Sequence, residues 1–333
     1  MSLATTSLLS QVRSLNIFGN CGIPKLSDFK FMRLLFVEVG DLNTAIDLTG
    51  INRLSQLRYL KVQGSSREAV VLLPAEIRGL RFLETLDLSG IVNSCGLREL
   101  VDVPRLSHVS APWFEGWGLP DGIGKTGESP FALYCGDAIL GSSFSPTFVN
   151  IERLYLGMLI LSSVPRWIGH LCCLRDLALV AKQIHQEDFN IIGTRLTSLV
   201  RLRLRIVHVP TERIVIEGST GFKVLKLFVF DCDGLSRLTF EAGAMPDLWE
   251  LKLTLNPYEW DKTTPIGLQH LPSLKIIDVS KTKFHDKLIF QDDDEDIDMI
   301  RRVFQEAADA LPARPALHVS PRGHWQSRPE EST

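Results

Sequence analysis

Residues 83–88 read LETLDL, residues 174–179 read LRDLAL, residues 199–204 read LVRLRL and residues 248–253 read LWELKL. These stretches share one frame, Leu-x-x-Leu-x-Leu, which ends in an alternation of apolar and other side chains. Such alternation is typical of a short strand with one buried face. One copy cannot bury that face alone, so the copies are expected to stack on one another.

The frame recurs along almost the whole chain. We place its starts at Val12, Leu34, Leu57, Leu83, Leu106, Ser129, Ile151, Leu174, Leu199, Phe222, Leu248 and Leu274. The step is about 24 residues, within the range of leucine-rich repeats. The weakest copy is at Ser129, where only the flanks hold the register. The fold class predicted is an α/β solenoid, a leucine-rich-repeat horseshoe of about 12 irregular repeats with a parallel concave β-sheet and a C-terminal helical cap.

A junction motif precedes several frames, as in LPAEIRGL from Leu73, LPDGIGKT from Leu119 and VPRWIGHL from Val164. Its Pro fixes a turn, its Ile is expected in the core, and its Gly lets the chain enter the next strand. Residues 124–126 read GKT, like the end of a phosphate-binding P-loop. A P-loop needs Gly at position 119, where this chain has Leu119. We therefore interpret this stretch as a degenerate repeat junction.

Bulk composition favours a globular protein. Of 333 residues, 45% are hydrophobic and 23% charged, and the net charge of −3 gives no general attraction to nucleic acid. No run of 18 apolar residues exists, so no transmembrane segment is expected. Six cysteines without a C-x-x-C pair, and no glycosylation sequon, favour a reducing, cytoplasmic setting. Cys172 and Cys173 are expected to pack between Leu171 and Leu174.

The search for catalytic and metal sites finds one cluster, His185, Glu187 and Asp188 in KQIHQEDF. A His beside carboxylates suits acid–base chemistry or a metal, but the i, i+4 His pair of a helical zinc site is missing. A polar helix start explains the cluster better. We expect no enzyme activity, no catalytic residues, no cofactor and no metal.

The remaining candidate site is the concave sheet, where alternate strand residues face away from the core. The candidates for partner binding are Arg153, Tyr155, Arg201, Arg203, Arg205, Lys226, Phe228 and Lys252. The cations among them suggest a basic ridge that meets an acidic partner surface, although exposed strand positions also carry Arg or Lys for solubility. Trp113 and Trp117 are a secondary candidate, either an exposed anchor or a cover for the irregular junction.

The C-terminal part departs from the repeat. Residues 292–298 hold six acids, expected in a solvated loop that leads into a helix. Apolar residues at helical spacing predict that helix over residues 297–311, and ALHVS (316–320) suggests a last short strand. The predicted domains are an N-terminal extension (1–11), the solenoid (12–290, irregular around 112–147), the acidic loop, capping helix and terminal strand (291–320), and a disordered tail (321–333).

Longer segments carry a resemblance to a known family. They include MRLLFVEV (32–39), VPRWIGHLCCLRDLAL (164–179), LTFEAGAMPDLWELKL (238–253) and RRVFQEAADALPARPALHV (301–319). These resemble the repeats of grass intracellular immune receptors of the coiled-coil, nucleotide-binding, leucine-rich-repeat class, over about residues 10–320. The resemblance implies recognition of a pathogen effector or guarded host protein, or contact with a receptor's nucleotide-binding domain. The family's coiled-coil and nucleotide-binding motifs do not match here, so its ATP and ADP chemistry is not expected.

Three functional hypotheses follow. The first is a defence-related recognition module that binds a protein partner through the concave face. The second is a general intracellular repeat scaffold or adaptor without a link to immunity. The third is a nucleotide-hydrolysing enzyme built on residues 124–126. The sequence leaves open the partner's identity, the oligomeric state and whether the chain is a whole protein or a fragment of a receptor.

Overall fold

A computed structural model of the chain describes residues 9–19, 23–39, 46–64, 70–72, 74–89, 91–92, 103–110, 150–281 and 293–320. The chain divides into two compact units. The first holds Met1–Pro112 and Asp137–Leu156, and the second holds Trp113–Gly136 and Gly157–Thr333. Strand β9 (Arg153–Leu161) begins in the first unit and ends in the second.

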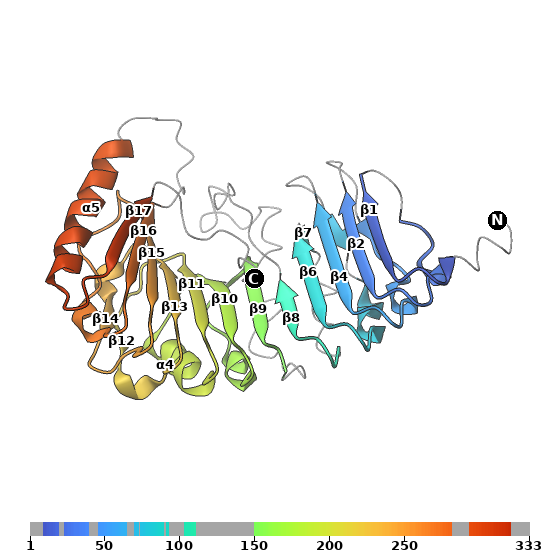
Figure 1. Cartoon of the computed structure of the whole chain (residues 1–333), viewed down its shortest axis with the longest axis horizontal. Coiled ribbons are helices and arrows are strands. Elements are labelled where there is room, and N and C mark those ends of the chain that lie inside the picture. The colour runs from blue at the N-terminus through green and yellow to red at the C-terminus, as the bar shows by residue number, and fades with distance from the viewer. Residues whose placement is uncertain are drawn as a thin grey trace. The chain divides into compact units, whose positions relative to one another are not determined.

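The first unit is built on parallel strands that pair in chain order (Figure 1). Its main sheet contains β1 (Ser14–Phe18), β2 (Leu34–Val39), β4 (Tyr59–Gly64), β6 (Thr85–Ser89), β8 (His108–Ser110) and the start of β9. A smaller parallel sheet contains β3 (Ile46–Asp47), β5 (Val70–Leu72) and β7 (Ile91–Val92). The 3-10 helices are η1 (Leu26–Asp28), η2 (Ile51–Arg53) and η3 (Ala75–Gly79).

The second unit repeats this plan. Its main parallel sheet contains β10 (Asp176–Ala181), β11 (Arg201–Ile206), β13 (Leu227–Asp231), β15 (Glu250–Leu255), β16 (Ile276–Lys281) and β17 (Ala316–Ser320). A second small sheet pairs β12 (Ile214–Ile216) with β14 (Leu238–Phe240). The helices are η6 (Arg166–His170), α4 (Gln186–Arg195), η7 (Gly218–Thr220), η8 (Leu235–Arg237), η9 (Leu268–His270) and α5 (Asp293–Ala310).

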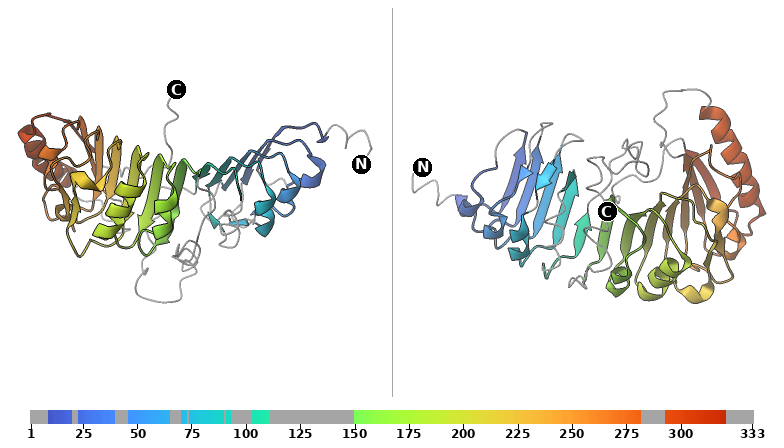
Figure 2. Two further views of the ribbon diagram at one scale, coloured as in Figure 1. Left: turned by 90° about the horizontal axis from the view of Figure 1, so that it is seen from below. Right: turned by 180° about the vertical axis from the view of Figure 1, so that it is seen from behind.

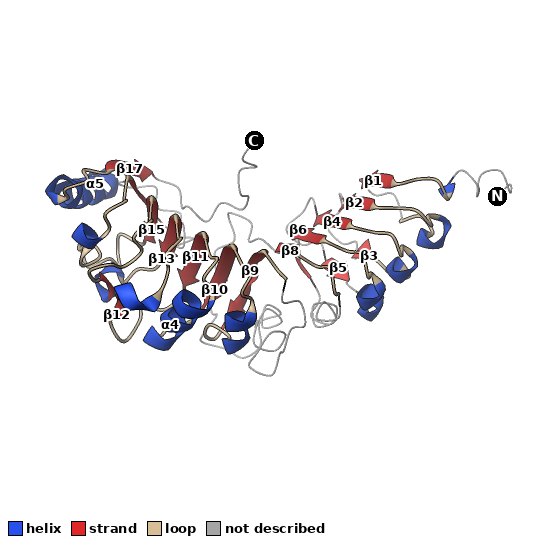
Figure 3. Cartoon of the chain, turned by 60° about the horizontal axis from the view of Figure 1, so that its bottom comes forward, coloured by secondary structure: helices blue, strands red, loops and turns tan. Residues whose placement is uncertain are grey.

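Within each unit, the short helices lie on one side of the strands (Figures 2 and 3). The chain returns from them through one recurrent turn, in which the frame's first residue donates its N–H to a carbonyl three residues earlier. Examples are Leu57 to Leu54 at 2.9 Å and Leu174 to Leu171 at 3.0 Å. All four of these Leu side chains are fully buried. The parallel-sheet solenoid predicted from the repeat is thereby confirmed.

The predicted junction motif is confirmed in two copies. Pro74 and Pro165 precede η3 and η6, and Ile77 and Ile168 within those helices are fully buried. Proline suits this position because its fixed φ favours the first turn and its missing N–H has no helical partner there. The copy at residues 119–126, with its GKT sequence, lies outside the described residues.

Two predicted frame starts are wrong. Pairing of Leu35 with Leu60 puts the second frame's start at Met32 rather than Leu34. Pairing of Phe228 with Leu202 puts a later start at Leu225 rather than Phe222. Both errors have the same cause, because an apolar residue at an outward position lets a shifted frame fit equally well. The start at Ser129 lies outside the described residues.

Helix α4 packs on an aromatic cluster in the core of the second unit. Phe189 of α4 lies with its ring centroid 6.4 Å from Phe222, 6.2 Å from Phe228 and 6.5 Å from Phe230. Phe222 has φ +53°, and at the preceding Gly221 (φ +94°) a Cβ would lie 1.8 Å from the carbonyl oxygen of Gly193. Glycine is therefore required where the chain leaves η7 and passes the last turn of α4 on its way to β13.

The C-terminal helix and strand form the expected cap. Helix α5 lies beside β17, which pairs with β16 as the last strand of the sheet (Figure 1). Phe304 of α5 is fully buried and stacks on Trp260 with ring centroids 5.9 Å apart. The helix begins at Asp293, four residues before the predicted start at Ile297, so the acids from Asp293 onward lie in helix rather than in a loop. Carboxylates are favoured there because a helix N-terminus carries partial positive charge.

The predicted packing of Cys172 and Cys173 is wrong, because both side chains are exposed. Their positions correspond to Thr197 and Ser198 one repeat later, which are also exposed. The two residues between the buried Leu171 and Leu174 lie in the recurrent turn rather than in the core.

Candidate functional site

The candidate site is the open face of each unit's main sheet, which we define as the face of the outward-pointing strand residues, opposite the short helices. In the second unit, parallel register aligns these residues in three rows across β10, β11, β13, β15, β16 and β17. The first row is Asp176, Arg201, Leu227, Glu250, Ile276 and Ala316; the middle row is Ala178, Arg203, Val229, Lys252, Asp278 and His318; and the third row is Val180, Arg205, Asp231, Thr254, Ser280 and Ser320.

The first row contains a two-point ion pair. Arg201 Nη2 donates to Asp176 Oδ2 at 2.6 Å, and Arg201 Nε donates to Asp176 Oδ1. The Asp176 side chain is only 4% exposed, whereas that of Arg201 is 30% exposed. Bidentate pairing of this kind is stronger than a single charged hydrogen bond and fixes the plane of the guanidinium. Arg201 therefore neutralises a buried carboxylate.

The third row contains a buried ion pair. Arg205 Nε lies 3.5 Å from Asp231 Oδ2, and both side chains are less than 10% exposed. Burial lowers the pKa of Arg205, and the negative charges of Asp231 and Asp233 oppose that shift. Further along the row, the buried hydroxyls of Thr254 and Ser280 share a hydrogen bond at 3.1 Å. Arg205 is thus held inside the structure and is not available on the face.

A second carboxylate lies just beyond β13. Burial raises the pKa of Asp233 to about 6, although its Oδ1 accepts the backbone N–H of Asn256 at 2.7 Å. The nearby charges of Asp231 and Glu259 raise it further. Burial also raises the pKa of Cys232 to about 12, so this thiol is protonated and unreactive at neutral pH.

The middle row carries the partly exposed cations Arg203 and Lys252. Lys252 Nζ lies 3.0 Å from Glu250 Oε1 and 3.8 Å from Asp278 Oδ2, with its side chain 28% exposed. Arg203 lies between Ala178 and Val229 in the register, and both of these are buried although they face outward. Long cationic side chains commonly lay their aliphatic part over apolar neighbours in this way.

The predicted basic ridge is corrected by these contacts. Acids alternate with its cations, so the face of the second unit is a paired network rather than a positive stripe. Lys226 does not face outward on a strand but precedes β13 at the edge of the sheet. Phe228 is fully buried in the aromatic core, because the true frame starts at Leu225. A role for Arg203 and Lys252 in partner binding stays a prediction.

The open face of the first unit has a different character. Phe18 is 58% exposed and meets Phe36 edge to face at 5.4 Å between ring centroids. Lys61 lies over the Phe36 ring at 5.3 Å and 3.7 Å from Asp87 Oδ2. Sequence reasoning did not select either Phe residue, although the alternation rule places both Phe18 and Phe36 at outward positions. The signal that could have found them is a large aromatic side chain at an outward strand position.

Two predicted site residues, Arg153 and Tyr155, lie on this first-unit face at the start of β9. Arg153 is exposed and pairs in register with His108, and Tyr155 is half-buried beside Ser110. The structure therefore places them on a different unit from Arg201, Arg203, Arg205 and Lys252. The secondary candidates Trp113 and Trp117 lie outside the described residues.

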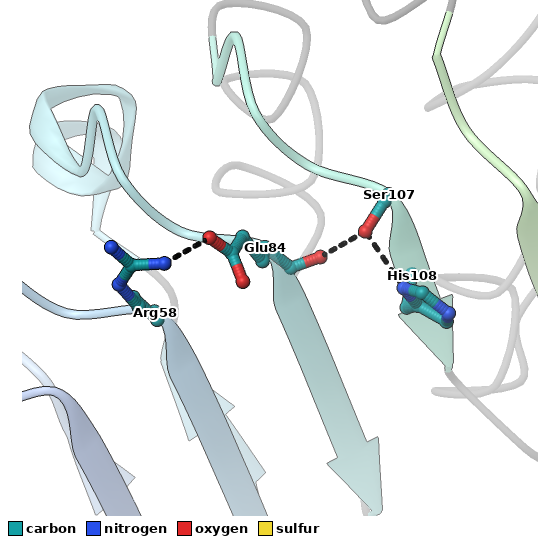
Figure 4. Close-up of polar contacts among 4 residues, drawn as sticks. All are labelled: Arg58, Glu84, Ser107 and His108. Carbon is teal, nitrogen blue, oxygen red and sulfur yellow. Dashed lines mark hydrogen bonds and ion pairs between the residues drawn. The ribbon is translucent and has the colours of Figure 1, made fainter.

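The amino edge of the sheet, where the strands begin, carries a row of exposed polar side chains. In the first unit, Arg58 Nη1 donates to Glu84 Oε1 at 2.7 Å, and Ser107 Oγ donates to the Glu84 carbonyl at 3.1 Å (Figure 4). Ser107 Oγ also lies 2.7 Å from His108 Nδ1. The charged pair is about half exposed on both sides, which makes it a weak contact.

The cluster at His185 is a helix cap. Asp188 Oδ2 accepts the backbone N–H of His185 at 2.8 Å, and the His185 side chain completes a capping box at the start of α4. Burial raises the pKa of Asp188. The polar helix start predicted for these residues is confirmed. Across the described part of the chain, no group of three or more His, Cys, Asp or Glu side chains is placed to hold a metal ion.

The fold combines parallel strands that repeat along the chain, a recurrent turn before each strand and an open sheet face. This combination defines a leucine-rich-repeat solenoid. The extended surfaces of such solenoids generally bind other proteins. Residues 11–126 and 131–317 match the family described as "Leucine-rich repeat region". The chain belongs to this family. In the ranges that the structure describes, no helix has the length and apolar character needed to cross a membrane.

One curated relative is the "Disease resistance protein RGA5" of Oryza sativa subsp. japonica. It is 30% identical over 344 residues, which cover 81% of this chain and 30% of the relative. The chain thus spans under a third of the relative's length. The likeness agrees with the predicted resemblance to the repeat region of plant disease resistance proteins.

Solved structures have folds with only a weak structural similarity to this chain. A Leptospira interrogans LRR protein, LIC12759, has a TM-score of 0.41 and 13% identity, covering 95% of this chain and 86% of that chain. A plant ice-binding protein has a TM-score of 0.38 and 14% identity, covering 80% and 81% of the two chains. These scores are too low to carry a functional argument.

Proposed function

We propose that this chain is a protein-recognition module of plant innate immunity. The observation that supports this proposal best is the 30% identity with a disease resistance protein over 81% of the chain. The partner is a pathogen effector, a guarded host protein or the nucleotide-binding domain of an immune receptor. Because the chain spans only 30% of that relative, the activity of the whole relative is not transferred to it.

The open faces supply the binding surface in this proposal. On the first unit, the exposed ring of Phe18 and the adjoining Phe36 and Lys61 offer aromatic area with a cation beside it. On the second unit, Arg203 and Lys252 are the accessible cations of the middle row. Aromatic and Arg side chains dominate binding energy at protein interfaces, so these positions are the first to test.

The test uses one paired variant for each unit: Phe18→Ala with Phe36→Ala, and Arg203→Glu with Lys252→Glu. Reversing Arg205 as well is unsuitable, because its buried charge pairs with Asp231 and breaking that pair would strongly destabilise the unit. Wild type and variants, each fused to a proximity-labelling enzyme, are expressed in infected grass leaf cells, and the labelled proteins are quantified by mass spectrometry.

Immune receptors, their nucleotide-binding domains or pathogen effectors should be enriched with wild type and depleted at least fivefold with one of the paired variants. The matched control is Arg213→Glu with Arg302→Glu, which reverses two exposed charges away from the open face. Enrichment of housekeeping signalling proteins alone, unchanged by any variant, would contradict the proposal and favour a general scaffold.

A further inference from the structure

A second surface of the second unit lies at the amino edge of its sheet. One residue from each repeat stands there, directly before the outward-facing rows: Arg175, Val200, Lys226, Trp249 and Lys275. We call these five residues the amino-edge row. The carbonyl of each row member accepts backbone N–H groups from the next repeat. Lys226 O accepts from Trp249 at 2.9 Å, and Trp249 O accepts from Lys275 at 2.9 Å.

This hydrogen-bond pattern fixes the register of the row's residues. Trp249 sits between Lys226 and Lys275 on three neighbouring repeats at one register position. Adjacent strands are about 4.8 Å apart, so the backbones of the two lysines are separated by about 9.6 Å. The backbone of Trp249 lies in the middle of that interval.

The row differs chemically from the open face beside it. Trp249 is 53% exposed, and Arg175, Lys226 and Lys275 are also exposed. Within the described residues, none of these three cations forms an ion pair, whereas Arg201, Arg205 and Lys252 on the open face all do. Cations without internal partners around an exposed aromatic ring are complementary to an acidic, partly apolar ligand.

We propose that the amino-edge row binds an acidic protein segment in which an apolar side chain lies between two carboxylates. The carboxylates face Lys226 and Lys275, and the apolar side chain covers the indole of Trp249. In a polyproline II segment, residues i and i+3 share a face and lie about 9.3 Å apart, which matches the lysine spacing. This surface is separate from the open faces, and the inference does not depend on a role in immunity.

Single-stranded nucleic acid is the other ligand that combines negative charge with stacking, but the row fits it less well. A nucleic acid carries a phosphate at every nucleotide and needs a longer basic track. Here Asp247 and Glu250 lie on either side of Trp249 in the sequence, and Asp247 is exposed. These carboxylates would repel a continuous phosphate chain, while a segment with only two spaced acids avoids them.

The experiment measures fluorescence anisotropy of the full chain with a fluorescein-labelled peptide of four Glu-Pro-Leu repeats, which places carboxylates at i and i+3 in polyproline II. Wild type should bind the probe, and binding should weaken as salt increases. Lys226→Glu with Lys275→Glu should weaken binding at least tenfold, and Trp249→Ala about fivefold. All three substituted forms, including the control below, should keep the wild-type melting temperature because the altered side chains are exposed.

The matched control is again Arg213→Glu with Arg302→Glu, which changes the net charge equally but lies off the row, and it should bind like wild type. Comparison peptides replace Glu with Gln or Leu with Ala, and a twelve-nucleotide oligo-dT tests the other ligand class. No binding of the Glu-Pro-Leu probe by wild type, equal binding of the Gln peptide, equal loss in the control, or tighter binding of oligo-dT would each overturn the proposal.

Discussion

The two units use the same repeat but place very different side chains on their open faces. In the first unit, Phe18 and Phe36 form an aromatic pair at the outward positions, and Phe18 is 58% exposed. In the second unit, equivalent positions hold ion pairs, among them Asp176 with Arg201 and Arg205 with Asp231. The comparison shows that outward register does not by itself make a side chain available to a partner.

The reason lies in the separation of adjacent strands. At about 4.8 Å, an Arg on one strand reaches an Asp at the same register position on the next strand. Placing acids opposite the arginines therefore converts the second unit's face into internal cross-strand contacts. Among the described residues of the first unit, the ion pair of Lys61 with Asp87 lies beside the aromatic pair, and both side chains remain partly exposed.

The largest expected effect tests the corrected register. Phe228→Ala should lower the free energy of unfolding by about 3–5 kcal/mol, because the ring is fully buried against Phe189 and Phe230 and its loss leaves a cavity. Phe18→Ala removes a ring of the same size from the first unit's open face. That change should cost at most about 1 kcal/mol, since the ring is mostly in water already. Urea unfolding of both variants measures the difference.

One result of these unfolding measurements would contradict the corrected register. Had Phe228 faced outward as the shifted frame suggested, the two substitutions would have similar small effects. A loss below about 1 kcal/mol for Phe228→Ala would therefore contradict the register that starts at Leu225.

The next prediction compares two cross-strand ion pairs. Asp176→Ala should destabilise the chain by about 2–3 kcal/mol, because Asp176 is 4% exposed and holds Arg201 at two points. Glu84→Ala breaks the ion pair of Glu84 (41% exposed) with Arg58 (49% exposed). This change should alter the free energy of unfolding by at most about 0.5 kcal/mol. Thermal unfolding at low salt and at 0.5 M salt should show that screening by salt removes the stabilising contribution of the exposed pair only.

Much of the fold was predictable from the sequence because the spacing of the buried Leu residues in each repeat sets the register of its strand. Nearly all of the predicted starts that fall on described residues, such as Leu57, Leu174 and Leu248, begin buried frames. The cap was also predictable, since the spacing of Ile300, Phe304 and Ala308 gives a helix with one buried face. Register failed only where an outward apolar residue, such as Leu34 or Leu227, imitated the core pattern.

The site was less predictable, and the reason is pairing between distant residues. Sequence reasoning placed Arg201 and Arg205 on the outward face correctly but did not place Asp176 and Asp231 opposite them. For Asp176 the frames at Leu174 and Leu199 already align it with Arg201, so this pairing was readable but not drawn. For Asp231 the misplaced frame at Phe222 hid the register of β13. The amino-edge row was missed for a different reason: alternation along a strand describes the two faces of a sheet and says nothing of its edge.

The last prediction concerns pH and Asp233, a part-buried carboxylate of the second unit, with the part-buried Asp87 of the first unit as the comparison. The pKa of Asp233 is raised to about 6 by burial, from an ordinary value of 3.8. Because the folded pKa is the higher one, protonation of Asp233 favours folding. Its contribution is fully present below pH 3.8 and is lost as pH rises through about 6.

Asp233→Asn removes this titration while keeping a carbonyl oxygen to accept the Asn256 N–H. Between pH 4.5 and pH 8, the variant's free energy of unfolding should improve relative to wild type by about 1–2 kcal/mol. Chemical denaturation at both pH values measures this difference, and Asp87→Asn supplies the background change from removing one partly exposed carboxylate that lies beside Lys61. If the pH-dependent change in the stability of Asp233→Asn equals that of Asp87→Asn, then Asp233 has an ordinary pKa. That result would show that the Asp233 carboxylate is exposed to water in the folded chain.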